Sequence, residues 1–333
     1  LKDIAEERPL IIVPDRVLGH LPFEAFLTAT PEDPSIYGDY PYLLQRHPIS
    51  YSYSATVLLN QIQRQDRREV PEKGVLAFAA SYPKQLSPDS YSYQRSGNIA
   101  RVREGLSPLP GAEEEVTLLE KHLWGAFFQG DRANETNFKQ KAHQYSIIHL
   151  AMHGVLNNNY PILSSLVFSE DSSEVEDNFL RAYEIAQMEL NADLVVLSAC
   201  ETGYGKFQQG EGVMSLAHSF AYAGASSVLM SLWQVNDHST SEIMKEYYTH
   251  LAKTYPKDYA LQHAKLHYID HSPENNLAHP AFWAAFVQTG NTASLELVAH
   301  TGKTFRQMHY LAMGGGVLAL VLLFFGVRRF RRQ

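Results

Sequence analysis

Short apolar runs alternate with amphipathic stretches along most of this chain. Each apolar run is bounded by polar or turn-forming residues, as expected for a buried strand. These runs cover residues 10–13, 75–80, 146–150, 193–199 and 226–232. Between them, apolar positions recur at helical spacing over residues 54–64, 112–122, 135–143, 211–223, 239–253 and 258–271. Buried strands that alternate with helices predict an α/β fold, in which helices cover both faces of a mostly parallel sheet.

Two polar stretches interrupt this pattern. Residues 81–109 are rich in Ser, Tyr, Pro and Gln without apolar periodicity, and residues 169–178 carry five acidic side chains. Stretches of this composition form surface loops. We therefore expect one domain over residues 1–292 with two long insertions, followed by a linker over residues 293–309.

The end of the chain has a different character. Residues 311–327 contain no charged or strongly polar side chain, and at helical rise they span roughly 26 Å, which is at the short end of what crosses a bilayer. Tyr310 stands at one edge as an aromatic anchor, and the arginine-rich tail 328–333 closes the other. Three consecutive glycines at 314–316 argue against a buried core helix. We predict a single transmembrane helix over residues 310–327.

Flanking charges bear on the membrane orientation. The tail holds four arginines, whereas the other flank offers Lys303 and Arg306. The positive-inside rule then places the C-terminus in the cytoplasm and residues 1–305 on the non-cytoplasmic side. A tail-anchored domain that faces the cytoplasm would have a similar sequence, so this alternative stays open.

Composition narrows the class of partners. The net charge is −8, and without the four terminal arginines it is −12, which argues against nucleic acid. The first residue is Leu1 rather than Met, so we expect a longer protein. Cys200 is the one cysteine, which excludes an intramolecular disulfide and any multi-cysteine zinc site.

Two predicted strands end in residues that carry chemistry. The strand over 146–150 leads into His153 and Gly154, and the strand over 193–199 leads into Cys200. If these strands are parallel neighbours, the imidazole and the thiol emerge side by side. An imidazole activates a thiol as a nucleophile and then protonates the leaving group. The backbone N–H groups of Gly154 and Cys200 are candidates for an oxyanion hole.

The residues alone leave other interpretations open. A lone cysteine on a strand is commonly an inert buried side chain. His149 lies four residues before His153 and suggests a metal ligand, but a metal site needs a third ligand and no HExxH occurs. We expect His149 to be a core histidine, and we expect no metal or cofactor.

A series of ordered motifs resembles the CHAT domain family. They are Val13-Pro14-Asp15, Leu21-Pro22-Phe23-Glu24, Leu109-Pro110-Gly111-Ala112-Glu113, His149 to Gly154, Ser198 to Gly203, Gly210-Glu211-Gly212, Ala223-Gly224-Ala225, Ser231 to Asp237 and His279 to Phe286. The resemblance covers about residues 9–290. It implies a caspase-like fold and kinship with caspases, separases and gingipains. It also implies that tetratricopeptide repeats precede this part of the chain.

Carried over residue by residue, the resemblance gives the catalytic histidine as His153 and the catalytic cysteine as Cys200. It implies a cysteine endopeptidase that cleaves protein or peptide substrates through a thioester, in a regulated signalling or stress and defence setting. One alternative is a catalytically silent, membrane-anchored interaction module with the same fold. A third hypothesis is acyl-transfer chemistry on a non-peptide substrate.

Two residues are candidates for a substrate pocket. Asp237 follows the strand over 226–232 and is suited to pair with a basic side chain, although an N-cap role for the helix near His238 is equally open. Several caspase-like peptidases carry an acidic residue two positions before the cysteine, and here that position is Ser198. The preference for the side chain before the cleaved bond therefore stays undetermined.

Overall fold

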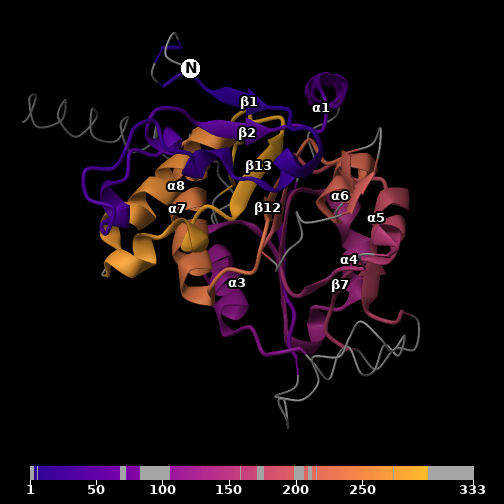
Figure 1. The fold of residues 1–333 in the computed structure, drawn as a ribbon. Helices are drawn as coiled ribbons and strands as arrows, with labels where there is room; N and C mark the ends of the chain where they lie inside the picture. Colours follow the sequence, from indigo (N-terminus) through magenta and orange to yellow (C-terminus); the bar gives the residue numbers. More distant parts are fainter. Residues whose placement is uncertain are drawn as a thin grey trace, which may run out of the picture.

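A single large sheet forms the centre of the molecule (Figure 1). The computed structural model describes residues 4–5, 7–67, 73–82, 106–157, 159–170, 176–198, 206–208, 212–214, 216–272 and 274–298. Within these residues the sheet has eight strands in the order β1-β2-β13-β12-β9-β5-β3-β4. They are β1 (Leu10–Ile12), β2 (Ile49–Tyr51), β3 (Lys73–Ala79), β4 (Gly125–Gln129), β5 (Tyr145–Ala151), β9 (Leu194–Leu197), β12 (Ser227–Ser231) and β13 (Phe286–Gly290). All neighbours in this order are parallel except β12 and β13, which confirms the expected mostly parallel sheet.

Helices cover both faces of the sheet, as expected (Figure 1). The helices on one face are α3 (Pro110–His122), α7 (Asp237–Ala252) and α8 (Lys257–His271), and those on the other are α4 (Glu135–Lys141), α5 (Ala182–Gln187) and α6 (Leu216–Ala223). A further helix, α1 (Ala55–Arg67), reaches the segment after α6, where Gln61 donates to the carbonyl of Ala225 (3.4 Å). Side chains along β5 alternate between two cores. Ile147 packs with the α3, α7 and α8 layer, and Ile148 with the opposite one.

Smaller elements decorate this frame. A three-stranded sheet consists of β6 (Gly154–Val155), β7 (Ser165–Val167) and β8 (Phe179–Arg181). A separate antiparallel pair consists of β10 (Lys206–Gln208) and β11 (Gly212–Met214). Short 3-10 turns are η1 (Arg16–His20), η2 (Phe23–Ala25), η3 (Tyr37–Asp39), η4 (Leu43–Gln45), η7 (Gly130–Arg132), η8 (Ala142–Gln144), η9 (Pro161–Leu163), η10 (Asn275–Ala278) and η11 (Pro280–Phe282).

The predicted elements match the structure unevenly. All five predicted strands lie in the main sheet, as β1, β3, β5, β9 and β12. The helix predicted from residue 211 is wrong in its first turn, because β11 pairs there and α6 begins at Leu216. Gly212 contributes to this difference, since glycine is a poor helix former. Most of the predicted loop 81–109 and the centre of 169–178 lie outside the described residues.

The packed part of the domain continues into the segment predicted as a linker. Leu295 and Leu297 are buried, and the N–H of Trp124 donates to the carbonyl of Val298 (2.8 Å). The predicted transmembrane segment 310–327 and the basic tail 328–333 lie outside the described residues. Among those described, no helix has the length and apolar character that a membrane crossing requires.

Candidate active site

Three strand ends meet at one edge of the sheet. Strands β5, β9 and β12 are parallel neighbours, so their carboxyl ends lie together, where α/β folds commonly place ligand sites. His153 comes two residues after β5, Ser198 directly follows β9, and Asp237 opens α7 after β12. The structure therefore places these three predicted site residues at the same edge. Cys200 lies outside the described residues.

His153 is held in one orientation. Its Nε2 lies 2.8 Å from the carbonyl oxygen of Ser107, so this nitrogen carries a proton and donates. The backbone N–H of His153 donates to the hydroxyl of Tyr82 (2.9 Å), which itself donates to the carbonyl of Val167 (2.6 Å). The Tyr82 ring also packs on the imidazole, with 4.8 Å between ring centroids.

The surroundings of His153 favour its neutral form. Burial lowers the pKa of His153 below the ordinary value of 6.5, and the Ser107 carbonyl and the negative charge of Asp237 oppose this shift only in part. In a neutral imidazole with the proton on Nε2, the lone pair is on Nδ1. His153 can therefore accept a proton at Nδ1 near pH 7.

Gly154 begins the short strand β6, opposite Leu166. In the same ladder the N–H of Val167 donates to the carbonyl of His153 (2.9 Å). Bonded and non-bonded pairs alternate along an antiparallel ladder, so the N–H of Gly154 points away from β7. The N–H of the predicted oxyanion donor is therefore directed away from its own sheet.

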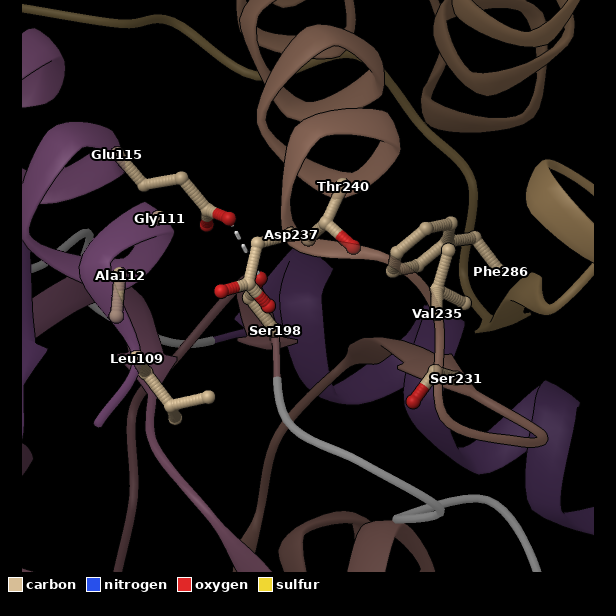
Figure 2. Close-up of a pocket in the computed structure, with 10 residues that line it drawn as sticks. All are labelled: Leu109, Gly111, Ala112, Glu115, Ser198, Ser231, Val235, Asp237, Thr240 and Phe286. Atoms are coloured by element: carbon tan, nitrogen blue, oxygen red, sulfur yellow. Dashed lines mark hydrogen bonds between the residues drawn. The ribbon is translucent and has the colours of Figure 1, made fainter. Parts of the chain in front are cut away.

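A pocket opens beside these strand ends, between the first turns of α3 and α7 (Figure 2). The empty space in and above it, open solvent included, is about 420 Å³. Its lining residues are Leu109, Gly111, Ala112, Glu115, Ser198, Ser231, Val235, Asp237, Thr240 and Phe286. Figure 2 shows the carboxylates of Glu115 and Asp237 directed toward the region where Ser198 lies. Both predicted pocket residues, Ser198 and Asp237, therefore line the same pocket.

A buried chain of polar contacts fixes Glu115. The hydroxyl of Ser198 donates to its Oε1 (3.1 Å), and Nε2 of His149 lies 3.1 Å from its Oε2. The other ring nitrogen of His149 lies 3.1 Å from the hydroxyl of Tyr248. Burial raises the pKa of Tyr248 far above its usual range, so the hydroxyl keeps its proton. His149 is a fully buried core histidine with both nitrogens engaged, as predicted.

Asp237 and the N-cap of α7 are different residues. The cap is Asn236, whose side chain accepts from the N–H of His238 (3.0 Å), which leaves Asp237 free of the capping role. Asp237 is the first residue of the helix, a position at which the helix dipole stabilises negative charge. Gly111 permits this placement, because a Cβ there would lie 2.9 Å from the Cβ of Asp237.

Three residues of this site were not predicted from the sequence. They are Glu115, Ser107 and Tyr82. Glu115 had one detectable signal, because it stands among Ala112, Val116 and Leu119 on the apolar stripe of its helix, where a charged residue is uncommon. Ser107 and Tyr82 lie in or beside a segment without periodicity, so nothing marked them.

A second cluster of carboxylates lies away from this edge. Glu135, Glu176 and Glu184 group their oxygens within 4.8 Å of one another. The ammonium of Lys139 lies 2.8, 2.9 and 3.0 Å from the three. This lysine already supplies the positive charge, so the cluster gives no support to a metal ion.

Taken together, the sheet and its strand-edge histidine define an α/β protein with a candidate active site at the carboxyl ends of parallel strands. The chain belongs to the CHAT domain family, whose family model matches residues 2–291. The resemblance found in the sequence motifs is thereby confirmed.

Curated relatives include tetratricopeptide repeat proteins. Tetratricopeptide repeat protein 28 of Mus musculus is 26% identical over 219 residues, which cover 56% of this chain and 9% of the relative. The Homo sapiens protein of the same name is 24% identical with the same coverage. The chain thus spans less than a tenth of these relatives.

Similar solved structures include two at low sequence identity. The Saccharomyces cerevisiae separase–securin complex matches with a TM-score of 0.48 and 12% identity, over 84% of this chain and 15% of that chain. The Arg-specific cysteine proteinase gingipain R matches with a TM-score of 0.45 and 12% identity, over 74% of this chain and 55% of that chain.

Proposed function

We propose that this chain is a cysteine endopeptidase in which His153 and Cys200 form the catalytic dyad. The observation that supports it best is the state of His153, a neutral imidazole at the end of β5 with its Nε2–H fixed on Ser107. Strand β9, which leads into Cys200, is the hydrogen-bonded neighbour of β5. The described ends of β5 and β9 therefore lie at one edge of the sheet, which supports the proposed dyad.

The reaction uses groups of this chain alone. Nδ1 of His153 takes the thiol proton as the sulfur of Cys200 attacks the peptide carbonyl carbon. The N–H groups of Gly154 and Cys200 stabilise the resulting oxyanion. The C–N bond then breaks as His153 returns the proton to the departing amine, which leaves a thioester on Cys200. Water, deprotonated by the same imidazole, hydrolyses the thioester and restores the thiol.

Cleavage of a diverse peptide library tests this proposal. Cys200→Ala should abolish cleavage and leave the melting temperature nearly unchanged. His153→Ala should also abolish cleavage, with a lower melting temperature because a buried ring and its hydrogen bond to Ser107 are lost. His143→Ala is a matched control, because His143 is an exposed histidine away from the strand edge, and it should retain full activity. Full activity of Cys200→Ala would refute the mechanism.

The competing hypothesis is a silent interaction module. Because Cys200 is the one cysteine in the chain, alkylation of the native protein by iodoacetamide reports on a single thiol. An activated thiol should react rapidly and with a pH dependence that His153→Ala suppresses. A slow thiol that does not respond to His153→Ala would favour the module. Fast alkylation without peptide cleavage would favour acyl transfer on a non-peptide substrate.

We also propose a setting for this activity. The curated relatives are tetratricopeptide repeat proteins, so we infer that such repeats are the partner of this domain in a regulated signalling or stress and defence role. The apolar segment 310–327 would hold the domain at a membrane, with the orientation still open.

A further inference from the structure

The pocket beside His153 carries concentrated negative charge. Of its ten described lining residues, two are carboxylates, Glu115 and Asp237, and none is lysine, arginine or histidine. They come from different helices and face the same space (Figure 2). Glu115 is 5% exposed, so little solvent screens it. Such a pocket attracts a cation and rejects an anion.

Two hydrogen-bond partners hold the carboxylate of Glu115 in place. Ser198 holds one of its oxygens and His149 the other, each at 3.1 Å. Because both oxygens are hydrogen-bonded, the Glu115 side chain keeps one conformation. It therefore needs no rearrangement to interact with a ligand. Its position is informative, because Ser198 stands two residues before Cys200. Through this contact, α3 places a carboxylate beside the end of β9.

The remaining wall is apolar. Leu109, Ala112, Val235 and Phe286 line the pocket beside the polar groups. Apolar walls that lead to carboxylates fit a long side chain with an aliphatic stem and a charged end, which describes lysine and arginine. The hydroxyls of Ser198 and Ser231 add polar partners for the N–H groups of such a side chain.

The pocket is close to the candidate base. Leu109 lines the pocket, and Ser107, two residues earlier, accepts the hydrogen bond from His153. The charge of Asp237 also acts directly on His153. A side chain held in the pocket therefore lies close to His153.

We propose that Glu115 and Asp237 form a specificity pocket for a lysine or arginine side chain of the substrate, next to the bond that is cleaved. This inference rests on the proposed peptidase function, whereas the assignment of Glu115 comes from the pocket itself. Glu115 and Asp237 are specificity-determining residues, and they take no part in proton transfer or nucleophilic attack.

Binding to the Cys200→Ala protein tests the pocket without any need for catalysis. The two probes are N-acetyl-arginine amide and N-acetyl-citrulline amide, which have nearly the same shape and differ in charge. Calorimetry should detect tighter binding of the arginine compound by about 10- to 100-fold, the range expected for hydrogen bonds to charged groups. Asp237→Asn and Glu115→Gln, each nearly isosteric, should each remove most of this difference.

Kinetics on the intact dyad provide the second arm. Matched peptides with arginine, lysine, citrulline or norleucine before the cleaved bond should show kcat/KM higher by about 10- to 100-fold for the charged pair. Above the acidic limb of the pH profile, Asp237→Asn should lower this ratio, mainly by slowing cleavage of the arginine and lysine peptides. Asp237 is half-buried in the first turn of α7, and asparagine has nearly the same shape, so we expect this variant to stay folded even if Glu115→Gln does not.

The outcomes separate the two proposals. Equal binding of the arginine and citrulline probes overturns the pocket, and so does an arginine preference that survives both substitutions. Selective binding of arginine without cleavage of any peptide keeps the pocket and overturns the peptidase. Cleavage that is indifferent to charge keeps the peptidase and overturns the pocket.

Discussion

A buried ion pair between Glu24 and Lys265 connects the N-terminal part of the chain with helix α8. Glu24 is 1% exposed and Lys265 is fully buried, with 3.1 Å between Glu24 Oε1 and Lys265 Nζ. The hydroxyl of Tyr51 donates to the second oxygen of Glu24, and the ammonium lies 6.0 Å from the centre of the Trp283 ring. Burial lowers the pKa of Lys265, and Glu24 counteracts this by favouring the charged form.

Removal of the negative charge should be costly. Glu24→Gln leaves an ammonium in the core without its counter-ion. At 3.1 Å and an effective dielectric constant of about 20, the attraction is worth about 5 kcal/mol. Measured losses on breaking a buried pair are about 3–5 kcal/mol. We therefore expect Glu24→Gln to lower the free energy of unfolding by about 3–5 kcal/mol, which is a large share of the typical 5–15 kcal/mol.

Urea unfolding of the variants measures this contribution. Replacing the whole group with Glu24→Leu, Tyr51→Phe and Lys265→Met should restore part of the lost stability, because no buried charge is then left unpaired. The restoration is incomplete because the N–H of Phe23 loses its acceptor, the hydroxyl of Tyr51 (2.8 Å). Glu242→Gln is a control in the exposed pair with Lys245 (3.7 Å), and it should change stability by well under about 1 kcal/mol. A Glu24→Gln loss below about 1 kcal/mol would refute the reasoning.

Two further predictions concern the base and the membrane segment. Because burial lowers the pKa of His153 below 6.5, kcat/KM for an uncharged peptide should rise with pH below 6.5 as the imidazole loses its proton. Asp237 raises that pKa, so Asp237→Asn should move this acidic limb to lower pH, and an unmoved limb would contradict the assignment. The full chain should float with liposomes in a density gradient, whereas a chain that ends at residue 309 should stay at the bottom; flotation of both would contradict the predicted anchor.

The sheet could be predicted where burial made the sequence uniformly apolar. Strand β9 is the clearest case, since all four residues from Leu194 to Leu197 are fully buried. Strand β13 escaped prediction because buried polar residues interrupt it. Gln288 is fully buried, where its side chain accepts from the hydroxyl of Tyr247 (2.9 Å). A segment that mixes Gln and Thr with apolar residues lacks the continuous apolar run by which a buried central strand is predicted.

Some residues of the candidate site could be predicted from local sequence, and others could not. His153, Ser198 and Asp237 come soon after apolar strands, so local sequence was enough to predict that they lie at the sheet edge. Glu115 precedes Ser198 by 83 positions, and the contact exists only because α3 packs over the end of β9. Ser107 is likewise 46 positions from His153. Partners at such separations are set by tertiary packing, which no local periodicity encodes.

Under the proposed function, Asp237 connects the choice of substrate with the protonation of His153. Its negative charge raises the pKa of His153, against the effect of burial. A cationic side chain in the pocket compensates that charge, so the imidazole stays neutral to lower pH when the preferred substrate is bound. An uncharged side chain leaves the influence of Asp237 in place. Because this carboxylate would attract the substrate and also adjust the pKa of His153, binding of the preferred side chain would widen the pH range in which the imidazole is neutral, while making it a weaker base.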